Sequence, residues 1–211
     1  MPLSHLLTFC GVAAVIIAIP GPSVLFTVSR ALSGGRRTAL LTVAGNEAGL
    51  LLQATAVAFG VGELAERSAQ VFTVIKLTGA AYLVYLGVQA IRHRRSLAEA
   101  VAGRTTPTRP LRAFGDGLVV GTMNPKTIVF FVAVLPQFAV RGAAAVPLQM
   151  LLLGAVFTAI ALVLDSAWAV AAGTAGQWLA RSPGRMAAIG GTGGLAMIGI
   201  GGSLAATGRN D

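Results

Sequence analysis

Two prolines interrupt apolar segments that are long enough to cross a membrane, and each lies in a short polar motif. The first motif is Pro20-Gly21-Pro22, within a stretch from about residue 5 to residue 29. The second is Asn124-Pro125-Lys126, within a stretch from about residue 115 to residue 138. Proline removes a backbone donor and clashes with the carbonyl four residues earlier, so each motif predicts a broken helix. Lipid cannot bond the freed backbone groups, so paired breaks at membrane depth indicate a transport site.

The composition predicts an integral membrane protein. The chain has 211 residues, of which 55% are hydrophobic and 11% charged, whereas a soluble domain carries roughly 25% charged residues. Mean hydropathy is +0.78. A chain of this length and composition is not expected to have room for a second large domain. The formal net charge is +9, but the basic residues lie between apolar spans and aromatic residues are few. They therefore suit a membrane surface better than a nucleic acid.

Six apolar segments have the length of about 20 residues that a bilayer requires. Eleven arginines lie in the odd-numbered connections between these segments and three on the opposite side. Because basic loops stay in the cytoplasm, we expect a multi-pass plasma-membrane protein with both termini outside. The six segments are residues 5–29, 38–62, 70–91, 115–138, 146–172 and 186–207.

The two halves of the chain are expected to form inverted repeats. A shift of 105 residues places Pro20 on Pro125. Each half has an odd number of spans, so the second half enters the membrane in the opposite direction, and the substrate site is expected between the halves. The expected fold is therefore an all-α membrane bundle, with a first repeat at 1–91, a basic cytoplasmic linker at 92–114 and a second repeat at 115–211.

The motifs themselves are candidate binding elements. A half-helix starting near Ser23 directs unpaired backbone N–H groups toward the middle of the membrane, where a carboxylate could bind. Asn124 can cap the half-helix that begins near Lys126. Lys126 itself lies near the midplane, where we expect it to hold the carboxylate together with the start of the half-helix at Ser23. The alternative is that both breaks serve only helix packing.

Two acids lie deep within apolar spans. Glu47 follows Asn46 in the second span, and Asp165 lies in the fifth. A charge in hydrocarbon costs about 3 kcal/mol even on lenient scales, and it usually marks a functional site. We expect Glu47 or Asp165 to receive a substrate ammonium group or a coupling proton, with Asn46 beside them. The alternative is a structural pair in which Glu47 only neutralises Lys126.

Several functions lack their usual residues. There is no phosphate-binding loop and no Gly-x-Ser-x-Gly elbow, so neither an ATP-driven protein nor a hydrolase is indicated. We expect no enzyme activity and no cofactor. Cys10 is the single cysteine, which excludes an intrachain disulfide. A cation or metal-ion exporter or channel and a structural membrane protein remain as rivals, and association of copies into a homo-oligomer stays open.

The motifs, taken together, resemble the LysE/RhtB family of bacterial amino-acid exporters across nearly the whole chain. One departure is Glu47, an acid that is not typical of the family pattern. The resemblance implies efflux of amino acids or close derivatives across the inner membrane, coupled to the proton gradient. The segments that carry it are Pro20-Gly21-Pro22, Gly34-Gly35-Arg36-Arg37, residues 79–87, Asn124-Pro125-Lys126, Phe130-Phe131, Leu135-Pro136-Gln137-Phe138, and Asp165 with Trp168.

Overall fold

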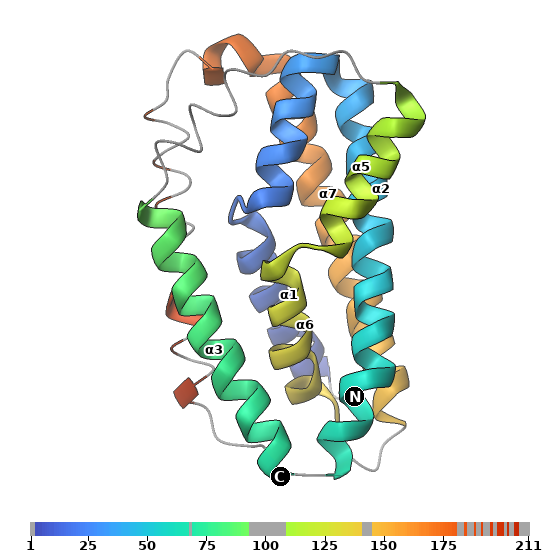
Figure 1. Cartoon of the computed structure of the whole chain (residues 1–211), viewed down its shortest axis with the longest axis vertical. Helices are drawn as coiled ribbons and strands as arrows, with labels where there is room; N and C mark the ends of the chain where they lie inside the picture. Colours follow the sequence, from blue (N-terminus) through green and yellow to red (C-terminus); the bar gives the residue numbers. More distant parts are fainter. Residues whose placement is uncertain are drawn as a thin grey trace.

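The fold is a bundle of long helices, seen in a computed structural model of the chain (Figure 1). The structure describes residues 3–67, 69–92, 109–140 and 145–180, together with single positions between 184 and 206. All regular elements in these ranges are α-helices. Most of the predicted sixth span at 186–207 and most of the predicted linker at 92–114 lie outside the described residues.

Both predicted helix breaks are confirmed. Helix α1 (Leu3–Ala18) ends just before the first proline motif, and α2 (Pro22–Arg67) begins within it. Helix α5 (Pro110–Thr122) ends before the second motif, and α6 (Pro125–Phe138) begins within it. The chain bends by 52° at the first break and by 47° at the second. Each bent pair together is apolar and long enough to form one broken span.

The predicted turn between the first two spans lies inside α2. Gly35 has φ 77° and ψ 176°, and a positive φ of this kind is readily adopted only by glycine. Beyond this turn, residues Gly34–Gly60 form an apolar segment long enough to cross a membrane. The turn allows the first part of α2 and this longer part to run side by side (Figure 1).

Two further long helices complete the described bundle. Helix α7 (Val146–Ala180) contains a second unbroken apolar segment, Val146–Thr174. Helix α3 (Ala69–Arg92) occupies the predicted third span and lies at one side of the bundle, next to α6 (Figure 1). The described helices thus contain two to four segments that meet a length and hydropathy criterion for spans. The complete six-span inverted arrangement stays a prediction.

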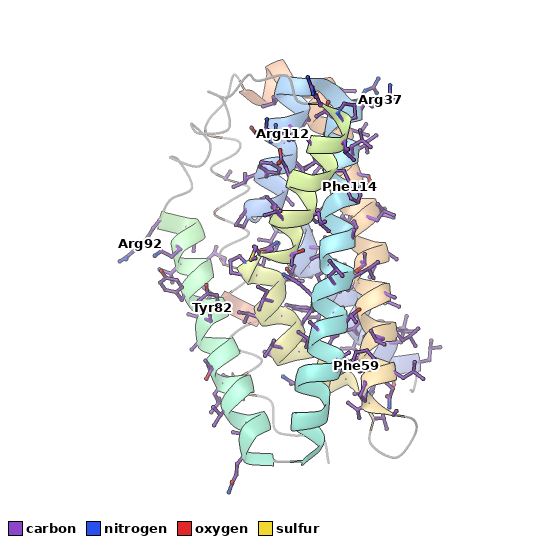
Figure 2. The ribbon with its side chains drawn as sticks, turned by 45° about the vertical axis from the view of Figure 1, so that its right-hand side comes forward. Arg37, Phe59, Tyr82, Arg92, Arg112 and Phe114 are labelled. Atoms are coloured by element: carbon purple, nitrogen blue, oxygen red, sulfur yellow. The ribbon has the colours of Figure 1, made fainter. Side chains whose placement is uncertain are left out.

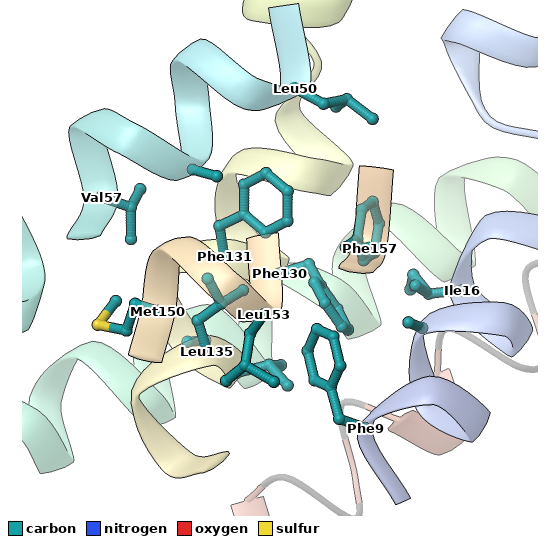
Figure 3. Packing of buried hydrophobic residues seen from close by; sticks show 14 of the residues in the cluster. Phe9, Ile16, Leu50, Val57, Phe130, Phe131, Leu135, Met150, Leu153 and Phe157 are labelled. Carbon is teal, nitrogen blue, oxygen red and sulfur yellow. The ribbon is translucent and has the colours of Figure 1, made fainter. Parts of the chain in front are cut away.

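An aromatic cluster holds α1 and α6 against α7. Phe9 of α1, Phe130 and Phe131 of α6 and Phe157 of α7 are almost completely buried (Figure 3). Their ring centroids lie 4.9–6.2 Å apart in tilted or edge-to-face pairs. Such pairs add about 0.5–1.5 kcal/mol each beyond the burial of apolar area. The cluster therefore joins the first, fourth and fifth predicted spans.

Helices α2 and α5 approach so closely that their backbones touch. A Cβ atom added to Gly45 would collide with the carbonyl oxygen of Phe114, and one added to Gly121 would collide with that of Asn46. Small residues permit this close packing of membrane helices. The approach places Asn46 at the contact between α2 and α5, one residue before Glu47.

Basic side chains lie at one end of the bundle. Arg37 and Arg112 occur at this end, whereas Phe59 lies toward the other (Figure 2). Arg92 lies at the upper end of α3, which is the end nearer to Arg37 and Arg112 (Figure 2). Helix α1 starts at Leu3 at the opposite end (Figure 1). The geometry is consistent with the predicted separation of basic loops, while the side that faces the cytoplasm stays a prediction.

Candidate functional site

The two helix breaks are in direct contact. The side-chain Nδ2 of Asn124 donates a hydrogen bond of 3.1 Å to the hydroxyl oxygen of Ser23. Ser23 lies at the start of α2, and Asn124 immediately precedes α6. Both side chains are buried. Residues that are 101 positions apart in the sequence thus connect the starting points of two half-helices.

Asn124 also caps α6, as its sequence position predicts. Its side-chain oxygen accepts a hydrogen bond of 3.1 Å from the backbone N–H of Lys126. Its carbonyl oxygen accepts bonds from the hydroxyl of Thr127 and from the N–H of Ile128. A cap of this kind satisfies a donor at the helix start that has no partner within the helix.

The ammonium group of Lys126 lies at the end of α1. Its Nζ donates to the carbonyl oxygens of Ile16 and Ile19, at 3.1 Å and 2.9 Å. Carbonyl groups at a helix C-terminus lack partners within the helix and carry partial negative charge. The expectation that only a substrate carboxylate or Glu47 could stabilise this cation is therefore incomplete, because the end of α1 already does so.

Gly21 is a close neighbour of Lys126. A Cβ atom added to Gly21 would lie 3.1 Å from Nζ, so the absence of a side chain there lets the ammonium group approach the first break. Lys126 and Asp165 interact electrostatically. An ammonium group has three N–H donors, and two are used by Ile16 and Ile19. The third makes no hydrogen bond to a described residue.

A second polar cluster joins α2 and α7. The Nδ2 of Asn46 donates to Glu47 Oε1 at 3.1 Å and to Asp165 Oδ2 at 3.4 Å. The two carboxyl groups are therefore linked through the same amide nitrogen of Asn46. Relative exposures of 2%, 5% and 4% for Asn46, Glu47 and Asp165 show that all three are almost completely buried.

Glu47 lies at the middle of the Gly34–Gly60 apolar segment, which is long enough to cross a membrane. A charge buried at such a position is costly.

The prolines contribute to the site mainly by breaking the helices, and less by lining it. Pro20 is buried and Pro125 is half-buried, while Pro22 is exposed and supplies the first position of α2. Proline is favoured at the first position of a helix because its missing N–H has no partner there. The predicted residues thus divide into those that set the breaks and those that present polar groups, namely Ser23, Asn46, Glu47, Asn124, Lys126 and Asp165.

Gln53 belongs to the same region, although the sequence analysis did not select it. Its side-chain Nε2 donates to the carbonyl oxygens of Gly121 and Thr122, at 2.9 Å and 2.7 Å. These carbonyls end α5. Gln53 therefore donates to the free carbonyl groups at the second break, as Lys126 does at the first break. A buried amide within an apolar span is a signal that could have identified it.

Asp116 forms an ion pair rather than facing water alone. Its Oδ2 lies 2.7 Å from Nη2 of Arg30, whose guanidinium also lies 4.8 Å from the ring centroid of Phe26. The pair connects the first part of α2 to α5. It therefore holds together the two half-helices that lead from the breaks toward the basic end.

Comparisons with known proteins agree with the transport interpretation of this geometry. A sequence model of the LysE type translocator family matches residues 14–208. The homoserine/homoserine lactone efflux protein of Salmonella typhimurium is 31% identical over 170 residues, which cover 81% of each chain. The threonine efflux protein of Escherichia coli is 30% identical over 134 residues, covering 63% of this chain and 65% of that protein.

An uncharacterized membrane protein of Vibrio cholerae is 38% identical over 136 residues. The match spans 64% of this chain and 63% of the Vibrio protein, so the chain covers less than two thirds of that relative. No solved structure matches the chain significantly.

Proposed function

The chain belongs to the LysE type translocator family, and we propose that it is a secondary active exporter of amino acids or close derivatives in the bacterial inner membrane. Export is driven by the proton gradient in this proposal. The family is one of transporters, which agrees with the expectation of no enzyme activity.

One observation carries the proposal. Two broken helices meet through Ser23 and Asn124, and buried groups of both charge signs surround the meeting point. Purely structural kinks would not require Lys126, Glu47 and Asp165 within the membrane, where each charge is costly. A zwitterion supplies both complementary charges, since its carboxylate and its ammonium group suit different parts of the site.

The carboxylate is placed at the first break in this proposal. The start of α2 at Ser23 carries partial positive charge, and the third N–H of Lys126 is free to bind an anion. The ammonium group is placed near Asn46, Glu47 and Asp165. Rocking of one half of the bundle against the other, around this fixed site, gives alternating access.

The relatives provide the first substrates to test. Their names specify homoserine, homoserine lactone and threonine, so L-homoserine and L-threonine are the initial probes. Cells that express the chain should tolerate higher concentrations of toxic amino acids or analogues and should release preloaded radiolabelled substrate faster. Cells that express Asp165→Asn at the same membrane level provide the control. Normal membrane insertion without resistance or faster release for any member of a broad amino-acid panel would contradict the proposal.

A cation or metal-ion exporter is not favoured. In the described parts of the chain, no three His, Cys, Asp or Glu side chains come together in a way that could hold a metal ion. Two relatives with named substrates are a homoserine/homoserine lactone efflux protein and a threonine efflux protein.

A further inference from the structure

Three buried oxygen atoms in the α2–α7 cluster have no hydrogen-bond partner among the described residues. They are Asn46 Oδ1, Glu47 Oε2 and Asp165 Oδ1. The same three side chains are already connected through Asn46 Nδ2, so the unpartnered oxygens belong to one site. A buried polar atom that lacks a partner is costly, because the loss of its hydration is not compensated. Three in one place indicate that the site binds something that donates hydrogen bonds.

The chemistry of the three oxygens specifies the donor. All three are acceptors, and the two carboxyl groups add negative charge. A primary ammonium group brings three N–H donors and one positive charge, which matches both the number and the sign. A single proton satisfies the charge but only part of the hydrogen bonding, because it resides on one carboxyl group at a time.

We propose that Asn46, Glu47 and Asp165 form an exchange site that holds either the substrate ammonium group or one proton, but not both. This inference rests on the proposed function and assigns its coupling step. When an ammonium group enters, the proton leaves the carboxyl group for water on the side that is open. When the ammonium group departs, a proton from the other side replaces it, and no covalent bond other than O–H is made or broken.

The exchangeable proton belongs to Glu47 in this scheme. Asp165 has a cationic neighbour, because it interacts with the Lys126 ammonium on α6. Two carboxylates this close repel each other when both are ionised. Lys126 compensates a negative charge on Asp165, so Glu47 is the group that holds the proton when substrate is absent.

Other described charges lie in separate contacts. Helix α5, which packs on α2, carries Asp116 and Arg112, and Asp116 pairs with Arg30 instead of Glu47. The described part of α1 carries no acid, and its histidine, His5, lies near the start of the helix, away from the first break. Among the described side chains, the charge that acts on Glu47 is therefore that of Asp165, and Lys126 acts on Asp165.

Proton release upon binding tests this inference directly. The purified full-length chain in detergent is titrated with L-homoserine and L-threonine by calorimetry, in two buffers of equal pH but different ionisation enthalpy. We expect about one proton released per substrate bound, and affinity that rises up to tenfold per pH unit while Glu47 is protonated. In Glu47→Gln the released proton should disappear and affinity should lose its pH dependence.

Two further variants separate chemistry from folding. Glu47→Asp keeps a carboxyl group, so it should still release a proton while binding substrate more weakly. Thr158→Val removes a buried hydroxyl on α7 that bonds only within its own helix, and it should behave as the wild type. The 2-hydroxy acid analogue of threonine lacks the ammonium group and should release no proton.

The outcomes distinguish this inference from the proposed function. Binding and export without proton release, or proton release that persists in Glu47→Gln, would overturn the exchange site and leave amino-acid export intact. If the wild type binds neither probe, the titration uses the substrate that the growth panel identifies. If the panel identifies none, the proposed function fails, and the exchange site fails with it.

Discussion

The amide of Asn124 donates to the hydroxyl of Ser23 over 3.1 Å, and this bond joins the starting points of α2 and α6. Both groups are buried, so water cannot easily take the place of either partner in this hydrogen bond. Asn124 uses its other side-chain atom to cap α6. One residue thus connects the two breaks and begins the second half-helix.

Substitutions at this contact should separate its two roles. Ser23→Ala leaves the Asn124 amide without an acceptor and should lower stability by about 1–3 kcal/mol. Asn124→Ala also removes the cap and should cost about 0.5–2 kcal/mol more. Asn124→Asp keeps the cap, and the Ser23 hydroxyl can donate to the new carboxylate, so this variant should be more stable than Asn124→Ala. Thermal unfolding in detergent measures the order, with Thr55→Val, an exposed hydroxyl deletion, as the control. An Asn124→Asp variant no more stable than Asn124→Ala would contradict the capping role.

The close approach of α2 and α5 should make Gly45 intolerant of a side chain. A methyl group there meets the carbonyl oxygen of Phe114, and overpacking costs about 1–3 kcal/mol. The shift would also move Asn46, so Gly45→Ala should reduce substrate efflux more than membrane level. Gly60→Ala is the comparison, because a methyl group at Gly60 meets nothing within 4 Å. Equal behaviour of the two variants in an efflux assay would show that the helices separate without cost.

Much of the described fold follows from local sequence features that predict where helices begin, end and turn. Proline at positions 20, 22 and 125 interrupts helical hydrogen bonding for local steric reasons, and Gly35 supplies the turn in the connection between the first two predicted spans. Asn124 caps α6 because local sequence determines the cap. These features depend on neighbours in the chain, so sequence patterns can predict them.

The partners of the buried charges depend on packing and could not be predicted in the same way. Sequence analysis paired Lys126 with a substrate or with Glu47, whereas the structure places it on the carbonyls of Ile16 and Ile19. That contact requires the exact rotation of α6 against α1. The role of Gln53 at the end of α5 likewise depends on which face α2 presents.

Orientation in the membrane is a separate prediction. Eleven arginines in the odd connections against three elsewhere predict that both termini lie outside the cytoplasm. A reporter that is active only in the periplasm should therefore be active when fused after Asp211. A fusion in the predicted linker 92–114 should instead activate a cytoplasmic reporter. Cytoplasmic activity of the fusion at Asp211 would contradict the orientation and remove the argument for inverted halves.

The Arg30–Asp116 ion pair should couple the two half-helices on the basic side. The separation is 2.7 Å, and both side chains are at least partly buried. A double-mutant cycle with Arg30→Gln and Asp116→Asn should show a coupling energy of about 1 kcal/mol in thermal stability. The cycle with Arg112→Gln is the control, since Arg112 is 78% exposed and lies 4.0 Å from the same carboxylate. Its coupling should be close to zero, and equal coupling in both cycles would argue against a specific contact.

Lys126 provides the most discriminating substitution. Lys126→Met removes the donor for the carbonyls of Ile16 and Ile19 and the cation beside Asp165. Unsatisfied buried carbonyls should lower stability by about 1–3 kcal/mol, and loss of the free N–H should abolish efflux.

The second substitution identifies the charge that Lys126 compensates. Adding Asp165→Asn to Lys126→Met removes an uncompensated carboxylate, so it should recover part of the lost thermal stability and membrane level. Adding Glu47→Gln should recover less, because Glu47 holds its own proton when substrate is absent. Efflux should stay abolished in both double variants, since each lacks the ammonium group that meets the substrate carboxylate. Recovery of transport in Lys126→Met with Glu47→Gln would instead make Lys126 a structural partner of Glu47, and its role in substrate binding would have to be abandoned.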